Sequence, residues 1–337
     1  MKKNLYAIIF SAAVLLGGLA MFAGILQFKG NAVLRGEDFY LSKRMTYAEV
    51  IDSLLPRIKH HTAFRLYADH LDLEHRFKPG RYVLKEGMNV MDLTRMFVLG
   101  LQTPVQVKFQ YAKIPAHLAA KLAPQLDADS AELVRALASP TLAREWGMDS
   151  VTLFSIFIPN TYELYWTTTP EEFVRRMHKE YERFWNEDRE KKRKAMGMSR
   201  LEVHTLASIV FEETRAVDEM PRIAGVYINR LKRGIPLQAD PTVKYAMQDF
   251  GLRRILFKHL KYESPYNTYL HRGLPPSPIA MPSIAALDAV LNYEHHDYIY
   301  FCARPTFDGH HNFARTLSEH NVNARAYSRE LNRRKIK

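Results

Sequence analysis

Hydrophobic and polar positions divide the chain into one long apolar run and many short periodic segments. Leu5–Leu26 contains no charged residue and is long enough, as a helix, to cross a hydrocarbon core of ~30 Å. The apolar region of a cleaved signal peptide is usually shorter, ~7–15 residues, so the run favours an uncleaved anchor. Lys2 and Lys3 precede it, and the positive-inside rule then predicts a cytoplasmic tail with the remaining chain outside the cytoplasm.

The segment that follows the apolar run predicts a small α+β module. Thr46 and Glu49 have the spacing of a capping box that opens a helix, and Asn89 and Gly100 have the residue types that begin and end another. The predicted elements are a strand, two helices, a strand after a Pro-Gly turn, a helix and a strand, at 38–41, 46–55, 62–71, 77–84, 89–100 and 104–111.

The middle of the chain predicts further helices around an aromatic segment. Residues 114–147 have helical spacing with a break near 127–130. Ile156–Trp166 is apolar and aromatic, which fits either a buried strand or exposed rings that stack on sugars. Thr169 and Pro170 begin a helix to about Trp185. The charge run 186–194 predicts a solvated helix face or a connector.

A helix opened by the capping box of Ser199 and Glu202 carries two adjacent carboxylates. At ~100° per residue, Glu213 shares one narrow face with the apolar side chains of Leu206, Ile209 and Val210, whereas Glu212 points away from that face. We therefore expect Glu212 to be solvated and Glu213 to be desolvated. Desolvation raises the pKa of a carboxylic acid, so Glu213 could donate a proton near neutral pH. The alternative is an ordinary surface helix with a Glu-Glu pair.

The last third of the chain alternates helices with polar loops. The predicted elements are helices at 222–232, 283–291 and 316–331, a strand of buried type at 298–303 and a hairpin at 307–313. Three turn-rich stretches lie between them, at 237–243, 264–269 and 273–282. Loops held between helices commonly carry binding residues.

Composition limits the chemistry of the chain. A net charge of +12 indicates an anionic neighbourhood such as an acidic polymer, an acidic membrane surface or nucleic acid, but no nucleic-acid motif is present. Cys302 is the one cysteine, which excludes an intrachain disulfide, and it lies in the apolar predicted strand as a core residue. The histidines lack metalloprotease spacing, and no nucleophile-elbow motif occurs, so we expect neither metal nor serine catalysis.

Several motifs in fixed order resemble one family, the MltG-type (YceG-like) endolytic murein transglycosylases. The chain resembles that family from the apolar run to the C-terminus, and the matching segments are 206–210 with Glu213-Thr214, 226–231, 237–243, 266–269, 273–276, 307–321 and, with Asn160 in place of Asp, 158–162. The chain departs from the family pattern at Phe211 and Glu212, and Ser277 stands where Gly is usual.

The resemblance implies an α+β chain with an N-terminal transmembrane helix, a LysM-like module and a larger, mostly helical catalytic domain. We expect the boundaries 1–4 (cytoplasmic tail), 5–27 (anchor), 31–105 (LysM-like) and 106–337 (catalytic). The family's catalytic glutamate falls on Glu213, and its substrate-binding positions fall on Gln238, Asp240, Asn267 and Thr268. The implied protein is a bacterial inner-membrane lyase that cleaves peptidoglycan glycan strands without cofactor or metal. Its implied partners are those strands and peptidoglycan synthases, with no nucleic acid.

Three other functions stay open on the residues alone. A glycoside hydrolase of the same polymer needs a second carboxylate, for which Asp240 and Glu163 are the candidates. A non-enzymatic wall-binding scaffold would use only the LysM-like part. A basic nucleic-acid binder would keep its large domain in the cytoplasm.

Overall fold

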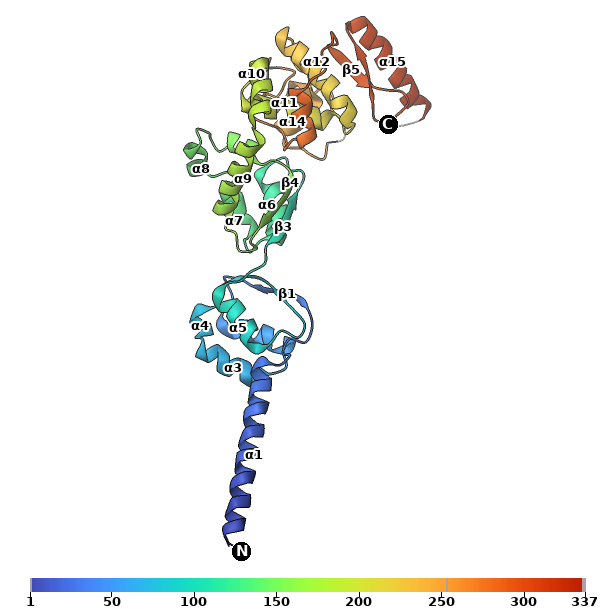
Figure 1. Ribbon diagram of the computed structural model, residues 1–337. Helices are drawn as coiled ribbons and strands as arrows, with labels where there is room; N and C mark the ends of the chain where they lie inside the picture. The colour runs from blue at the N-terminus through green and yellow to red at the C-terminus, as the bar shows by residue number, and fades with distance from the viewer. Residues whose placement is uncertain (1, 253, 335–337) are drawn as a thin grey trace. The chain divides into compact units, whose positions relative to one another are not determined.

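The computed structural model describes residues 2–252 and 254–334 of the chain, whose elements are mostly helical with short strands (Figure 1). Contacts between backbone positions divide the chain into two compact units. The first unit consists of Met1–Val107, Gln125–Ala128 and Tyr162–Thr169, and the second of Lys108–Pro124, Asp129–Thr161 and Pro170–Lys337.

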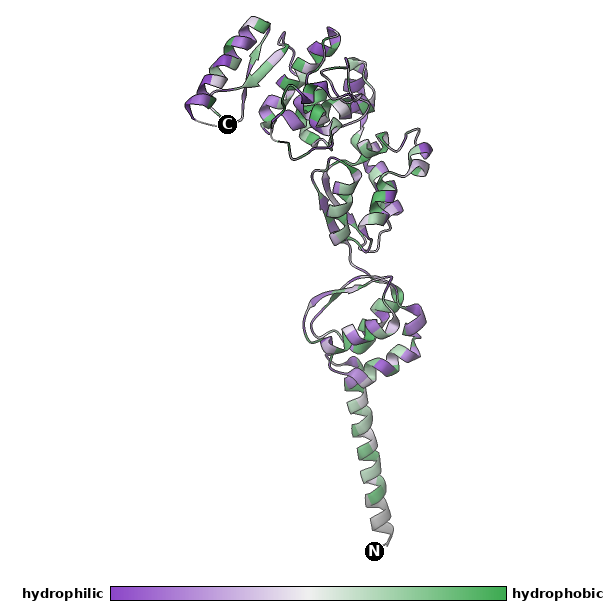
Figure 2. Cartoon of the chain, turned by 180° about the vertical axis from the view of Figure 1, so that it is seen from behind, coloured by the Kyte–Doolittle hydropathy of each residue, from purple (hydrophilic) through white to green (hydrophobic). Residues whose placement is uncertain are grey.

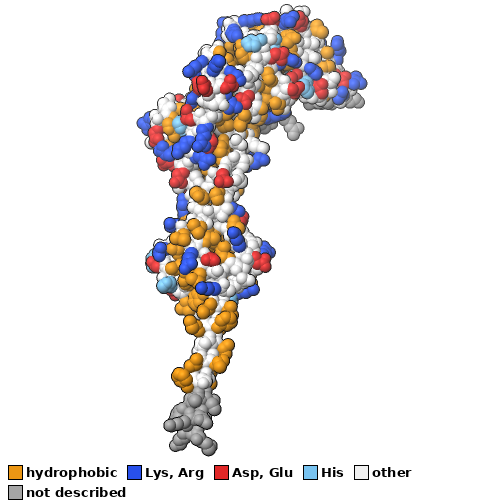
Figure 3. All heavy atoms as spheres, viewed as in Figure 1, with side chains coloured by type: hydrophobic (Ala, Val, Ile, Leu, Met, Phe, Trp, Pro, Cys, Tyr) orange, Lys and Arg blue, Asp and Glu red, His pale blue; other side chains and the backbone are white. Residues whose placement is uncertain are grey.

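The first helix of the chain is α1 (Lys2–Lys29), and most of it is coloured as hydrophobic in Figure 2. Its stretch Ile9–Lys29 is long and apolar enough to cross a membrane. The space-filling view shows hydrophobic side chains along this helix (Figure 3), and Phe10 and Met21 are 72% and 70% exposed to solvent. An N-terminal apolar helix is therefore confirmed, and such a helix is consistent with an anchor or a signal sequence.

The remainder of the first unit packs helices against a two-stranded sheet. Strands β1 and β2 pair antiparallel with Phe39 opposite Tyr82. The Tyr82 ring meets the Phe97 ring edge-on at 5.0 Å between centroids, and both side chains are fully buried. The elements are β1 (Glu37–Leu41), α2 (Tyr47–Leu54), α3 (His61–His70), α4 (Leu73–Arg76), β2 (Gly80–Leu84) and α5 (Val90–Leu99).

Local capping explains why the helix ends of this unit were predictable. The Thr46 side chain accepts from the backbone N–H of Glu49, whose carboxylate accepts in return from the N–H of Thr46. Asn89 caps α5, and Gly100 ends it in the left-handed region at φ 69°. Both predicted caps are confirmed. Each cap satisfies helix-end groups within four residues, so it needs no tertiary contact.

The second unit is a group of helices with a two-stranded sheet near its C-terminal end. Strands β5 and β6 pair antiparallel with Phe301 opposite Phe313. Strands β3 (Val105–Phe109) and β4 (Asn160–Leu164), whose residues are divided between the two units, form a further two-stranded sheet. The other elements are α6 (Pro115–Leu122), α7 (Ser130–Leu137), α8 (Pro140–Glu145), α9 (Pro170–Phe184), α10 (Glu187–Met196), α11 (Arg200–Glu213), α12 (Met220–Lys232), α13 (Asp240–Ala246), α14 (Ile284–Leu291), β5 (Tyr300–Ala303), β6 (His311–Ala314) and α15 (Leu317–Arg333).

Helix α11 is the central element of this unit. Every residue from Val203 to Val210 is buried, because α11 packs against α12, α13 and α14. The hydroxyl group of Ser208 lies in this core and is hydrogen-bonded there as both donor and acceptor. Its Oγ donates to Thr205 O at 2.7 Å and accepts from the backbone N–H of Ile279 at 3.0 Å, which attaches the 273–282 loop to the helix.

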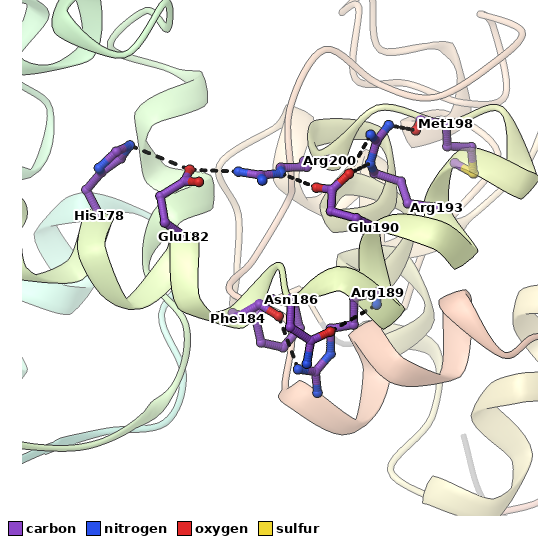
Figure 4. A network of polar contacts seen from close by, with 9 residues as sticks. All are labelled: His178, Glu182, Phe184, Asn186, Arg189, Glu190, Arg193, Met198 and Arg200. Carbon is purple, nitrogen blue, oxygen red and sulfur yellow. Dashed lines mark hydrogen bonds and ion pairs between the residues drawn. The ribbon is translucent and has the colours of Figure 1, made fainter.

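Ion pairs hold the start of α11 against the two preceding helices (Figure 4). The Arg200 guanidinium donates to Glu190 of α10 at 2.6 Å and to Glu182 of α9 at 2.7 Å. Arg193 donates to the other oxygen of Glu190 and to Met198 O. These groups are partly exposed, so each pair contributes little alone. Together they fix the direction in which α11 enters the core.

Three sequence predictions need correction. The stretch 237–243 was predicted as a loop, but α13 begins at Asp240 with Pro241 in its first turn. The segment 298–303 was predicted as a buried strand, but every residue of β5 is partly exposed. Ile156–Trp166 is only partly a strand, because a 3₁₀ turn (Thr152–Ile156) precedes β4.

Gly225 of α12 lies where the backbone of another segment leaves no room for a side chain. A Cβ at this position would lie 2.3 Å from the backbone carbonyl oxygen of Glu294. We expect Gly225→Ala to destabilise the protein by about 2 kcal/mol, since a backbone atom must move to relieve the overlap. Thermal unfolding of the full chain in detergent measures this loss. Gly251→Ala is the matched control, because its Cβ would have no neighbour closer than 3.7 Å; an equal loss in both variants would contradict the steric explanation.

Candidate active site

Glu213 is the last residue of α11 and lies at a cavity of about 410 Å³. The helix stops there because Thr214 adopts an extended conformation, at φ −142° and ψ 149°. The cavity is lined by residues of α11, α12, α13, β5, β6, α15 and the loops between them: Glu213, Tyr227, Arg230, Leu237, Gln238, Asp240, Tyr269, Tyr300, Phe301, Cys302, Ala303, His311, Leu317 and His320.

The carboxyl of Glu213 is held by α12. The Tyr227 hydroxyl donates a hydrogen bond to Glu213 Oε1 at 2.6 Å. The pKa of Glu213 is raised to about 7, with burial as the largest cause. The negative charges of Asp240 and Glu212 also raise the pKa, whereas the hydrogen bond from Tyr227 lowers it. Glu213 is therefore a carboxylic acid that holds its proton up to neutral pH, as the helical-phase argument predicted.

Asp240 and Gln238 reach the same cavity from the start of α13. The Tyr269 hydroxyl donates to Asp240 Oδ1 at 2.6 Å, which fixes the orientation of that carboxylate. Gln238 adopts a left-handed backbone conformation at φ 52°, which costs energy for a residue with a side chain. Both side chains line the cavity, so the structure brings them together with Glu213.

Asn267 and Thr268 are fully buried and are not among the cavity-lining residues. The Asn267 amide donates to Leu260 O at 3.0 Å and to Tyr262 O at 2.8 Å. Thr268 Oγ1 accepts from the backbone N–H of Ala239 at 3.0 Å. Both side chains therefore hydrogen-bond the backbone of neighbouring segments, and Thr268 fixes the backbone directly before Asp240.

Glu212 is not solvated, and that prediction was wrong. Its side chain is 9% exposed and forms an ion pair with Lys113 at 2.9 Å. The Tyr111 hydroxyl donates to its other oxygen at 2.7 Å. Both partners come from the segment before α6, about 100 residues earlier, which local helical phase cannot reveal.

Sequence reasoning missed several residues that line the cavity. Arg230 is buried and donates to the backbone carbonyls of Ile299, Pro236 and Leu237, so it fixes the loop that precedes α13. Cys302, expected in the core, lines the cavity, and burial raises the pKa of its thiol. The sequence could have indicated a role for Tyr227, because a buried tyrosine on the inward face of a helix needs a hydrogen-bond partner.

A second cavity of about 770 Å³ lies beside α9 and the start of α11. Its arginines, Arg193 and Arg200, are already paired with Glu190 and Glu182. The Trp146 ring is stacked on His178 at 3.9 Å between centroids. Because its charges neutralise one another, we place the candidate site at the Glu213 cavity.

A family model described as the YceG-like family matches residues 39–326 of the chain. The chain belongs to the YceG-like family. Its fold is also that of a Listeria monocytogenes protein described as YceG-like, whose crystal structure aligns with a TM-score of 0.57 and 24% identity over 86% of this chain and 98% of that one.

Two relatives of this YceG-like chain carry a named activity. A Bacillus subtilis protein named endolytic murein transglycosylase is 42% identical over 129 residues, and a Streptococcus pneumoniae protein of the same name is 33% identical over 134 residues. The matches cover 37% and 39% of this chain. The chain spans 35% of the length of the first relative and 24% of the length of the second. The similarity to these named enzymes is therefore a similarity to part of each.

Proposed function

We propose that the chain is a membrane-anchored endolytic lytic transglycosylase that cleaves peptidoglycan glycan strands. The observation that carries the proposal is Glu213, whose pKa is raised to about 7 inside a cavity lined by hydrogen-bonding side chains. Membership of the YceG-like family and the names of the two relatives support the same activity. A general acid works best when its pKa lies near the operating pH.

In the proposed reaction, neutral Glu213 gives its proton to the glycosidic oxygen between N-acetylmuramic acid and N-acetylglucosamine. The bond from C1 to that oxygen breaks and leaves an oxocarbenium-like sugar. The Glu213 carboxylate then takes the proton of the C6 hydroxyl, whose oxygen closes onto C1. The products are a 1,6-anhydro-muramic end and a free N-acetylglucosamine end, and no water is consumed. Gln238 and Asp240, which line the same cavity, hydrogen-bond the sugar hydroxyl and acetamido groups.

The remaining domains complete the proposal. Residues 1–4 form a cytoplasmic tail, 5–27 a single-pass anchor in the bacterial inner membrane, 31–105 a LysM-like glycan-binding module and 106–337 the catalytic domain outside the cytoplasm. The apolar helix α1 supports the anchor, and the placement of helices α2, α3 and the short α4 between strands β1 and β2 supports the LysM-like assignment. Cleavage of nascent strands near the membrane would terminate their elongation beside a peptidoglycan synthase.

A glycoside hydrolase is the second candidate, because Asp240 is a second carboxylate in the same cavity. The two reactions differ by one water in the product. Mass spectrometry of digests of polymerised, uncrosslinked glycan by the full chain in detergent separates them. We expect 1,6-anhydro ends. Reducing-end muramic acid, heavier by one water, would establish the hydrolase and exclude the lyase.

Removing the hydrogen bond from Tyr227 tests whether Glu213 sets the pH dependence of this reaction. Glu213 acts as an acid only when protonated, so the rate should fall as the pH rises through about 7. Tyr227→Phe removes a contact that lowers the pKa of Glu213. We therefore expect the alkaline limb of the pH–rate profile to move up by about one pH unit.

Tyr245→Phe is the control for this measurement, because it removes a partly buried hydroxyl that does not line the cavity. A Tyr227→Phe profile that coincides with wild type would show that Glu213 does not set the alkaline limb.

A further inference from the structure

A buried carboxylate next to the cavity is paired with a histidine that lines it. Glu219 ends the short 3₁₀ turn Val217–Glu219 before α12 and is 3% exposed. Its Oε1 accepts from the backbone N–H of His311 at 2.9 Å, and its Oε2 lies 2.8 Å from His311 Nδ1. Among the ion pairs of the described residues, His311 is the side chain that contacts this carboxylate.

The two contacts fix both the place and the tautomer of the imidazole. A carboxylate accepts hydrogen bonds, so the proton lies on His311 Nδ1 and the opposite nitrogen, Nε2, is left without a contact to Glu219. The Phe301 ring stands perpendicular to the imidazole at 5.3 Å between centroids, which restricts rotation of the ring. His311 also lines the cavity that contains Glu213.

We propose that His311 is a second substrate-contacting residue of this site, whose Nε2 accepts a hydrogen bond from a hydroxyl of the sugar at the cleavage point. Glu219 is then a positioning residue that acts through His311. This inference rests on the proposed glycan substrate. It explains why a carboxylate is buried beside the cavity with a histidine as its partner, since burying a carboxylate costs free energy that a purely structural contact seldom returns.

The neighbouring pair supplies a contrast within the same two segments. His310 Nε2 lies 3.3 Å from Asp218 Oδ2, and the Asp218 side chain is 76% exposed. Neither residue lines the cavity. The chain thus carries two adjacent histidine–carboxylate pairs, one at the cavity and one at the surface.

Two substitutions of His311 separate substrate contact from structural support. The amide of an asparagine reaches the position of Nδ1, so His311→Asn keeps a donor for Glu219 but has nothing in place of Nε2. The amide of a glutamine reaches the position of Nε2, so His311→Gln presents an acceptor to the cavity and gives up the Glu219 contact. A residue that serves only the fold should tolerate the asparagine better. A residue that contacts substrate should tolerate the glutamine better.

The experiment measures kcat/KM for cleavage of uncrosslinked glycan by the full chain in detergent, with thermal unfolding of each variant. We expect His311→Asn to lose about tenfold, and His311→Gln, which lacks only the orienting contact to Glu219, to lose about threefold. His310→Asn, the surface control, should match wild type. Wild-type rates in His311→Asn, or equal losses in both His311 variants, would overturn the proposal.

The wild-type digest keeps the two levels of inference apart. If it contains no 1,6-anhydro ends, the proposed lyase reaction fails irrespective of His311. If it contains them and the ranking of the His311 variants is reversed, only the role given to His311 fails.

Discussion

Glu213→Gln should lower the rate of glycan-strand cleavage by about a thousandfold while leaving the fold intact, since a positioned general acid contributes roughly 10²–10⁴. Glutamine has the shape of the protonated acid and can still accept the hydrogen bond from Tyr227. It has no proton of suitable acidity to give to the glycosidic oxygen. The measurement is the release of anhydro ends per unit time, and Glu263→Gln, which removes an exposed carboxyl, is the control.

The same substitution should stabilise the protein at alkaline pH. The pKa of Glu213 is raised from 4.5 to about 7 in the folded state, so folding favours the protonated acid. Below pH 4.5 Glu213 is protonated in both the folded and the unfolded state, so the raised pKa does not change the free energy of unfolding. Above pH 7 the full difference, about 3 kcal/mol, opposes folding. Glu213→Gln removes that cost, so its urea midpoint should exceed that of wild type at pH 8 and match it at pH 4.5.

Loss of activity together with a gain in stability is the combination that identifies Glu213. A residue that supports only packing would lose both when substituted. An active variant, or one that is inactive because it is unfolded, would remove Glu213 from the chemistry. Enzymes commonly hold such groups at a cost in stability, because the geometry that tunes the acid is not the geometry that best stabilises the chain.

The parts of the structure that the sequence predicted well are those that depend on near neighbours. The Ser199–Glu202 capping box opens α11 as expected, because its hydrogen bonds join residues three apart. The pattern of apolar residues before Glu213 predicted burial of that carboxyl, because helical phase is also a local property. These two features together place the acid at the end of a buried helix.

The parts that were missed depend on contacts between distant segments. Glu219 and His311 are 92 positions apart in sequence, and the residues around either one do not indicate that the two side chains are in contact. The start of α13 was missed because its N-cap residue, Ala239, has no capping side chain; the contact at this helix end comes from another loop, where Thr268 Oγ1 accepts from the backbone N–H of Ala239. β5 was predicted to be buried from its apolar residues, yet those residues form a wall of the cavity.

Glu212 also has a partner that is distant in sequence, Lys113, and breaking this ion pair is expected to lower stability strongly. Lys113 and Glu212 have side chains that are only 15% and 9% exposed. Lys113→Met leaves the Glu212 carboxylate buried without its ammonium partner. Because Tyr111 still donates to that carboxylate, we expect a loss of about 3 kcal/mol, at the low end of the range for breaking a buried pair.

The double variant Lys113→Met with Glu212→Gln separates the pair from its surroundings. Removing both charges leaves no buried uncompensated ion, because Arg215, which lies 3.8 Å from Glu212, has a side chain that is 65% exposed. Urea unfolding of the double variant should therefore show most of the lost stability restored. The Glu212 charge also raises the pKa of Glu213, and Glu212→Gln should therefore move the alkaline limb of the pH–rate profile to lower pH. Additive losses in the double variant would mean that the two side chains act independently. The carboxylate beside the catalytic acid would then need a partner other than Lys113.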